Sequence, residues 1–298
     1  MFSKIISSIL IIGGFILLNF STPIYAEKIT VLSDAELDNI SAGGIDIDIN
    51  AAEAFRSAVV SQSNIGAFKG FSLNNISLNN YNLSAINNTG NSAVGLQSNI
   101  AAVVAQKGDI KAATINNNNT ATINNTGSLE GALSASLANI NAPLGLVTIN
   151  RVYADKSAVA SQSNIAVIAA LEGNIKDSLI NNKNFAALTN FGNSAVASQS
   201  NIAVVVARGN IDNTTINNLN EAIVTNTGLN TALGGGAQVQ NFNYSGLLGS
   251  LQINHLSVAY SAEAAQSNIA IVLSLGGGNV SNTHINSSNI ATVINTNP

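Results

Sequence analysis

The tetrapeptide Gln-Ser-Asn-Ile occurs five times in this chain of 298 residues, and its spacing strongly constrains the fold. Successive copies start 35, 65, 37 and 67 residues apart. Because short and long steps alternate, the larger repeat spans about 100 residues and contains two units of about 36 residues and a spacer. Such units cannot bury an apolar face alone, but they can do so by stacking. The copies start at Gln62, Gln97, Gln162, Gln199 and Gln266.

The segments inside each unit have the composition of β-strands. Apolar and β-branched runs such as Ile202 to Ala207 are bounded by Gly-Asn or Asn-Asn pairs that favour turns. We therefore predict an all-β repeat protein, a β-solenoid with Asn and Gln ladders, in which small residues such as Ala195, Ala197 and Ala203 fill the interior. A helix is the alternative for the alanine-rich run from Ala160 to Ala170 and for the leucine-rich spacers.

Asparagine makes up about one residue in six, whereas only 9% of the residues are charged. The charged share of an ordinary globular protein is about 25%. A side-chain amide carries donors and acceptors, so stacked amides can hydrogen-bond to the identical side chain above and below. We expect these ladders to hold the stack together and to support assembly. The candidate ladder residues are Gln62, Asn64, Gln97, Asn99, Gln162, Asn164, Gln199, Asn201, Gln266 and Asn268.

Two junctions between units read Gly90-Asn-Ser-Ala-Val-Gly-Leu-Gln97 and Gly192-Asn-Ser-Ala-Val-Ala-Ser-Gln199. They resemble the Gly-Asn-x-Ala-x-x-x-Gln half of the repeat in curlins, which are secreted subunits of bacterial functional amyloid. The resemblance implies that Asn91, Gln97, Asn193 and Gln199 belong to stacked ladders. The other half of the curlin repeat is missing, and the units here are longer. The cysteine-free alternation of units and spacers also resembles the Fap-type functional amyloid subunits.

The N-terminal segment has the layout of a secretory signal peptide. Lys4 precedes an apolar run from Ile5 to Phe20, and small and polar residues follow up to Ala26. We expect cleavage after Ala26 and a protein that a secretion machinery exports to the extracellular space or the cell surface, without stable membrane insertion after cleavage. A retained membrane anchor is the alternative, although the run is shorter than the usual span of about 20 apolar residues.

The segment from Leu32 to Gly44 resembles the double-glycine leader of bacteriocins, with Glu36, Leu37 and Ile40 at the family's spacing. Such leaders are cleaved by a transporter that carries a peptidase. The alternative is a short helix that joins the signal peptide to the repeats. The expected segments are a signal peptide at 1–26, a leader-like segment at 27–56, a repeat pair at 57–128, a spacer at 129–156, a second repeat pair at 157–228, a second spacer at 229–260 and a partial third repeat at 261–298.

The chain offers few groups for catalysis. It has no cysteine, and its two histidines, His255 and His284, lie outside any metal-ligand spacing. Asp46 and Asp48 alternate with isoleucines, as on a half-exposed strand, and no second acid or basic partner recurs in the repeats. We therefore expect no enzymatic activity, no cofactor and no metal ion.

The composition favours a structural function. A net charge of −4 provides no basic surface, so nucleic-acid binding is not expected. We expect an extracellular matrix or fibre subunit, similar to functional amyloid, that forms a homopolymer through the unpaired strand edges at the ends of the stack. The alternative is a monomeric β-solenoid adhesin or surface-binding protein with capped ends and one flat face of repeated residues. A carbohydrate-active β-helix enzyme, the third class, requires several acids in one groove.

Overall fold

The structure, a computed structural model, describes residues 46–54, 56–127, 133–141, 145–227, 237–245, 250–259 and 261–296. The expected signal peptide and double-glycine-like segment lie outside these residues. Every regular element within them is a β-strand. The prediction of an all-β repeat protein is therefore confirmed, and the run from Ala160 to Ala170 belongs to a strand rather than to a helix.

Ten long strands form five pairs, and each pair is called here one rung of a stack. The first strand of a rung is joined to the second by a turn, which in rungs 1, 2 and 5 contains a short additional strand. In chain order the rungs are β2 Ala58–Gly70, β3 Leu73–Asn74 and β4 Ser77–Asn88; β5 Ala93–Ala105, β6 Ile110–Lys111 and β7 Thr114–Asn125; β10 Ser157–Ala170 and β11 Ile175–Asn190; β12 Ser194–Ala207 and β13 Ile211–Asn226; and β16 Ala262–Ser274, β17 Val280–Ser281 and β18 His284–Asn295.

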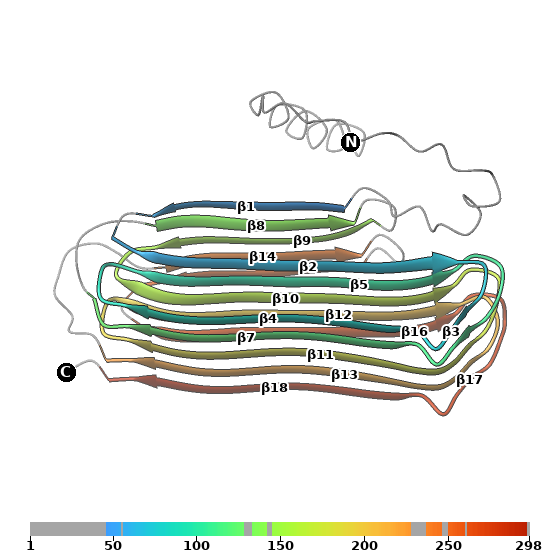
Figure 1. Cartoon of the computed structure of the whole chain (residues 1–298). Helices are drawn as coiled ribbons and strands as arrows, with labels where there is room; N and C mark the ends of the chain where they lie inside the picture. The colour runs from blue at the N-terminus through green and yellow to red at the C-terminus, as the bar shows by residue number, and fades with distance from the viewer. Residues whose placement is uncertain are drawn as a thin grey trace, which may run out of the picture. The chain divides into compact units, whose positions relative to one another are not determined.

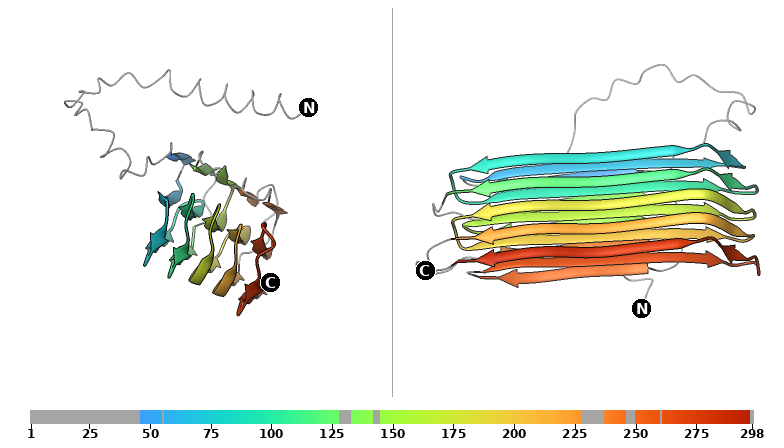
Figure 2. Two further views of the ribbon diagram at one scale, coloured as in Figure 1. Left: turned by 90° about the vertical axis from the view of Figure 1, so that its right-hand side faces the viewer. Right: turned by 90° about the horizontal axis from the view of Figure 1, so that it is seen from below.

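Successive rungs pair in parallel and in an unbroken register. The first long strands form a central sheet with the order β16-β12-β10-β5-β2, and the second long strands form a facing sheet with the order β18-β13-β11-β7-β4. Each tetrapeptide glutamine lies opposite that of the next rung, from Gln62 to Gln266. Figure 1 shows these strands side by side, and Figure 2 shows the rungs following one another in chain order.

The two spacers and the strand before the first rung form a third sheet, the cover sheet, so a helix in the spacers is wrong. Its strands are antiparallel, because each spacer folds as a hairpin. Along these strands buried residues such as Leu133 and Leu137 alternate with more exposed ones such as Ser134, which is the pattern of a sheet with one covered face. In sheet order the strands are β1 Asp46–Ala54, β8 Leu133–Asn141, β9 Leu146–Ala154, β14 Ala237–Ser245 and β15 Ser250–Val258.

The central sheet is covered on both faces, and every residue of β10 and β12 is buried. Toward the facing sheet it packs through small and β-branched residues, and Ala195, Ala197 and Ala203 are fully buried there, as predicted. Toward the cover sheet it packs through larger side chains such as Leu96 and Ile165. The core therefore consists of thin, repeated layers, which explains how a chain with 5% aromatic residues buries its apolar surface.

One residue of every rung adopts a left-handed backbone conformation close to the start of its second long strand. Its φ angle lies between 49° and 54° at Asn75, Ala112, Asp177, Asn213 and Asn282. Asn and Asp tolerate this conformation because their short polar side chains hydrogen-bond to the nearby backbone. Ala112 has no such side chain, so the left-handed conformation is least favourable in rung 2.

Replacing Ala112 with Asn is therefore expected to raise the free energy of unfolding by about 0.5–1 kcal/mol. The matched control is Ala187→Asn, which places the same side chain on an extended part of β11 and provides no relief of strain. Chemical denaturation of both variants measures the difference. An equal effect of the two substitutions would contradict the assignment of strain to Ala112.

Candidate functional site: amide ladders and the ends of the stack

A continuous glutamine ladder runs through all five rungs of the central sheet. Each Nε2 atom donates to the Oε1 atom of the glutamine on the preceding rung, over 3.0, 2.7, 2.8 and 2.7 Å from Gln97 to Gln266. Each of these Nε2 atoms also donates to a backbone carbonyl of the facing sheet at 2.9 Å, for example that of Phe185 from Gln162. The ladder thus links neighbouring rungs and, at the same time, the two sheets.

A second ladder, of asparagines, lies two residues further along the same strands. From Asn64 to Asn268, each Nδ2 atom donates to the Oδ1 atom of the next rung at 3.0 Å. The facing sheet carries a matching ladder, and the two ladders bond to each other: Asn164 donates to Asn184 and Asn184 donates to Asn201, both at 3.0 Å. Ten amides therefore form one zigzag network between the sheets.

Sequence reasoning identified the tetrapeptide ladders but missed the asparagine ladders of the facing sheet. Two of them are buried beside the central ladders, one lies near the end of the facing strands, and one runs along the outer face of that sheet. The recurring Ile-Asn-Asn motif of the repeats was the available sign of them. Their members are Asn82, Asn119, Asn184, Asn220 and Asn289; Asn80, Asn117, Asn182 and Asn218; Asn88, Asn125, Asn190, Asn226 and Asn295; and Asn79, Asn116, Asn181, Asn217 and Asn286.

Asn91 and Asn193, which the curlin resemblance places in a ladder, lie on rungs 2 and 4 with Lys156 of rung 3 between them. The backbone N–H of Lys156 donates to Oδ1 of Asn91 at 3.1 Å, and its carbonyl accepts from the backbone N–H of Asn193. The physical reason is that the chain enters rung 3 from the hairpin of the cover sheet, so the Gly-Asn junction is absent there. These two asparagines therefore bind the chain crossing between sheets rather than each other.

The two ends of the stack are open within the described residues. The strands β2 and β4 at one end, and β16 and β18 at the other, each pair with a neighbour on one side only. Apolar side chains at these ends are exposed although their equivalents inside the stack are not. Ile285 is 48% exposed whereas Ile216 on the preceding rung is fully buried, and Phe68 is 42% exposed whereas Val103 is fully buried.

The two histidines lie on different strands of the structure. His255 on β15 and His284 at the start of β18 are both exposed. No three His, Cys, Asp or Glu residues among those described lie close enough to hold a metal ion. The described segments also contain no helix that is long and apolar enough to cross a membrane.

Asp212 links the turns of rungs 4 and 5 at the surface. Its carboxylate accepts hydrogen bonds from Oγ of Ser281 at 2.9 Å and from Nδ2 of Asn282 at 3.0 Å. These two bonds, first that of Ser281, lower the pKa of Asp212 below its usual value of 3.8. The lowered pKa means that the folded state favours the ionised form of Asp212. The contact therefore contributes its full stabilisation above pH 3.8, and this contribution is lost as the pH falls through the lowered pKa.

Comparisons of the chain with family models, with curated proteins and with solved structures found no match. The functional argument therefore depends on the ladders and on the ends of the stack.

A buried ladder member should matter far more for stability than an exposed one on the same strand. Asn184 donates to three acceptors and accepts from two amides, so Asn184→Ala is expected to lower the free energy of unfolding by at least about 2 kcal/mol. The control Asn181→Ala removes a partly exposed ladder member three residues away, where water can replace the lost partners, and should cost less than about 1 kcal/mol. Equal losses in thermal or chemical unfolding would contradict the role assigned to the buried network.

Proposed function

We propose that the protein is a secreted structural protein, a subunit of an extracellular matrix or fibre that assembles by stacking its β-repeats as functional amyloid does. In fold terms, we propose that the rungs are the coils of a β-solenoid. The observation that carries this proposal is the match between the two open ends. Because the register is unbroken, rung 5 presents its ladder residues at the same positions as rung 1, with Gln266 aligned to Gln62 and Asn268 aligned to Asn64.

The direction of the ladders makes the two ends complementary. The glutamine ladder donates toward rung 1, so Nε2 of Gln62 and Oε1 of Gln266 make no hydrogen bond within the described residues. The asparagine ladder donates in the opposite sense, which leaves Oδ1 of Asn64 without a donor. A second copy placed in register would supply the missing acceptor to Gln62 and the missing donor, from Asn268, to Asn64.

Burial of apolar surface supports the same arrangement. The inward-facing side chains Ile285 and Val293 of rung 5 are 48% and 43% exposed, whereas their equivalents on rung 4 are fully buried. A further rung would cover them and would add about 25 cal/mol of stabilisation for each Å² removed from water. Open parallel edges with unpaired backbone groups favour such additions.

A second candidate function is a monomeric adhesin or surface-binding protein. The observation that favours it is the outer face of the facing sheet, where the ladder from Asn79 to Asn286 forms a regular row of amides at the surface. A monomer of this kind is expected to have capped ends, whereas both ends of the stack are open within the described residues.

The substitution Gln62→Glu tests assembly without removing any contact inside the chain. Oε1 still accepts from Gln97, but the free Nε2 donor becomes a carboxylate oxygen that would face Oε1 of Gln266 in the next copy. At pH 7 we expect elongation of seeded assemblies, followed by thioflavin fluorescence, to slow at least tenfold. Below about pH 4 the glutamic acid is protonated and can donate again, so growth should recover toward that of the unmodified chain at the same pH.

The matched control is Gln238→Glu, the same exchange at an exposed position of β14 away from the ends. It should leave elongation unchanged, and both variants should keep the melting temperature of the unmodified chain. Elongation that is unaffected by Gln62→Glu, or an unmodified chain that remains a folded monomer at high concentration and with seeds, would refute the proposed stacking.

A further inference from the structure

The outer face of the cover sheet carries polar side chains in two straight rows, called here the polar rows. The strands β8, β9, β14 and β15 each contribute one residue to each row, because these residues are opposite one another in the antiparallel register. None of these side chains makes a hydrogen bond to another described residue. The first row is Ser136, Arg151, Gln240 and His255, and the second is Ser134, Tyr153, Gln238 and Ser257.

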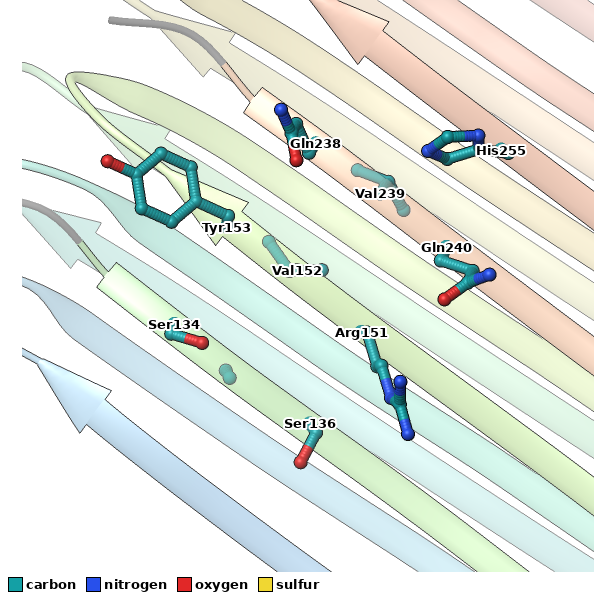
Figure 3. A pocket seen from close by; sticks show the side chains of 10 residues that line it. Ser134, Ser136, Arg151, Val152, Tyr153, Gln238, Val239, Gln240 and His255 are labelled. Atoms are coloured by element: carbon teal, nitrogen blue, oxygen red, sulfur yellow. The ribbon is translucent and has the colours of Figure 1, made fainter.

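The unpaired state of the polar rows contrasts with the other polar surface of the stack. On the facing sheet the outer asparagines bond to one another, for example Asn181 to Asn116 at 2.8 Å, so that their amides are already paired. On the cover sheet the hydroxyl, amide and guanidinium groups border an open groove of about 450 Å³. This volume lies within the range of small-molecule sites. Figure 3 shows Arg151 and Tyr153 standing out from β9 and Gln240 from the neighbouring strand β14.

The charge of the groove is opposite to that of the chain. Arg151 and His255 line it, and no Asp or Glu is among its lining residues, although the chain as a whole has a net charge of −4. The nearest acid in register is Glu53, which lies opposite Ser134 one strand beyond the groove. One permanent cation among many neutral hydrogen-bonding groups suits a ligand that carries occasional carboxylates and many hydroxyls.

The spacing of the rows indicates a ligand that is extended. Neighbouring strands are about 4.8 Å apart, which is close to the length of one pyranose ring. A polysaccharide chain laid across the strands would therefore meet one new pair of polar side chains at each sugar. Tyr153, which is 46% exposed, offers a ring for stacking, and the adjacent row of Ile149, Phe242 and Ile253 offers an apolar surface to the C–H faces of the sugars.

We propose that the polar rows bind an acidic polysaccharide that runs along the stack, perpendicular to the strands. Arg151 forms the charged hydrogen bonds with a uronate carboxylate. Gln238, Gln240 and the serine hydroxyls bond to the sugar hydroxyls. The site is formed within one chain, so it does not depend on assembly of the chain into fibres.

The test is binding of polygalacturonate to the full chain, measured by titration calorimetry, with dextran as the neutral polysaccharide and poly-L-glutamate as the anion without sugars. We expect binding of polygalacturonate that is at least tenfold tighter than that of either comparison polymer. The double variant Arg151→Gln with Gln240→Ala should weaken it at least tenfold. The matched control Lys183→Gln removes one exposed positive charge from the outer face of the facing sheet and should leave the affinity unchanged.

Three results would overturn the inference. The first is that the folded, unmodified chain does not bind polygalacturonate. The second is equal weakening by the double variant and by Lys183→Gln, which would indicate attraction to the whole surface. The third is equal affinity for poly-L-glutamate, which would indicate an anion site without recognition of sugars. The assembly behaviour of Gln62→Glu is independent of all three, so failure of this site and failure of stacking can be distinguished.

Discussion

The structure depends on the requirement that a buried side-chain amide finds partners for its donor and its acceptor groups. An amide left without partners away from water costs about 1–3 kcal/mol. An identical amide on the rungs above and below meets this requirement, because neighbouring strands are about 4.8 Å apart. The distances of 2.7 to 3.0 Å along the glutamine ladder show that every internal rung meets it. A shift of register by one residue would place Ser, Leu or Ala opposite each glutamine, so the ladders fix the register and, with it, the apolar layers.

The same interaction explains why the ends of the stack differ from its middle. Each internal amide of the glutamine ladder bonds to the rung on either side, whereas Gln62 and Gln266 have a rung on one side only. The apolar clusters follow the same rule, since the interior between the sheets is closed along its length and open at the two end rungs. The cover sheet adds a third layer that buries the second face of the central strands, and its own outer face carries the polar rows.

Much of the fold could be predicted from the repeated tetrapeptide. The alternating spacing of Gln62 and its equivalents indicated stacked strands in register, and the short apolar runs between Asn and Gly pairs indicated strands. The role of the spacers could not be predicted, because the alternation of Leu133 to Asn141 is compatible with pairing to any neighbour, and only the tertiary packing selects an antiparallel sheet over the central strands. The expected ladder between Asn91 and Asn193 does not form for a related reason. The hairpin that interrupts the repeats places Lys156, rather than an asparagine, at the equivalent position of rung 3.

The most direct test of the account is the axial rise per chain in assembled material, measured by electron microscopy together with fibre diffraction. Five rungs per chain and about 4.8 Å per strand predict a strong reflection near 4.7–4.8 Å and a rise of about 24 Å for each chain. A rise of about 4.8 Å per chain would mean that each chain contributes a single flat layer. That result would contradict a stack of preformed five-rung subunits held together by amide ladders.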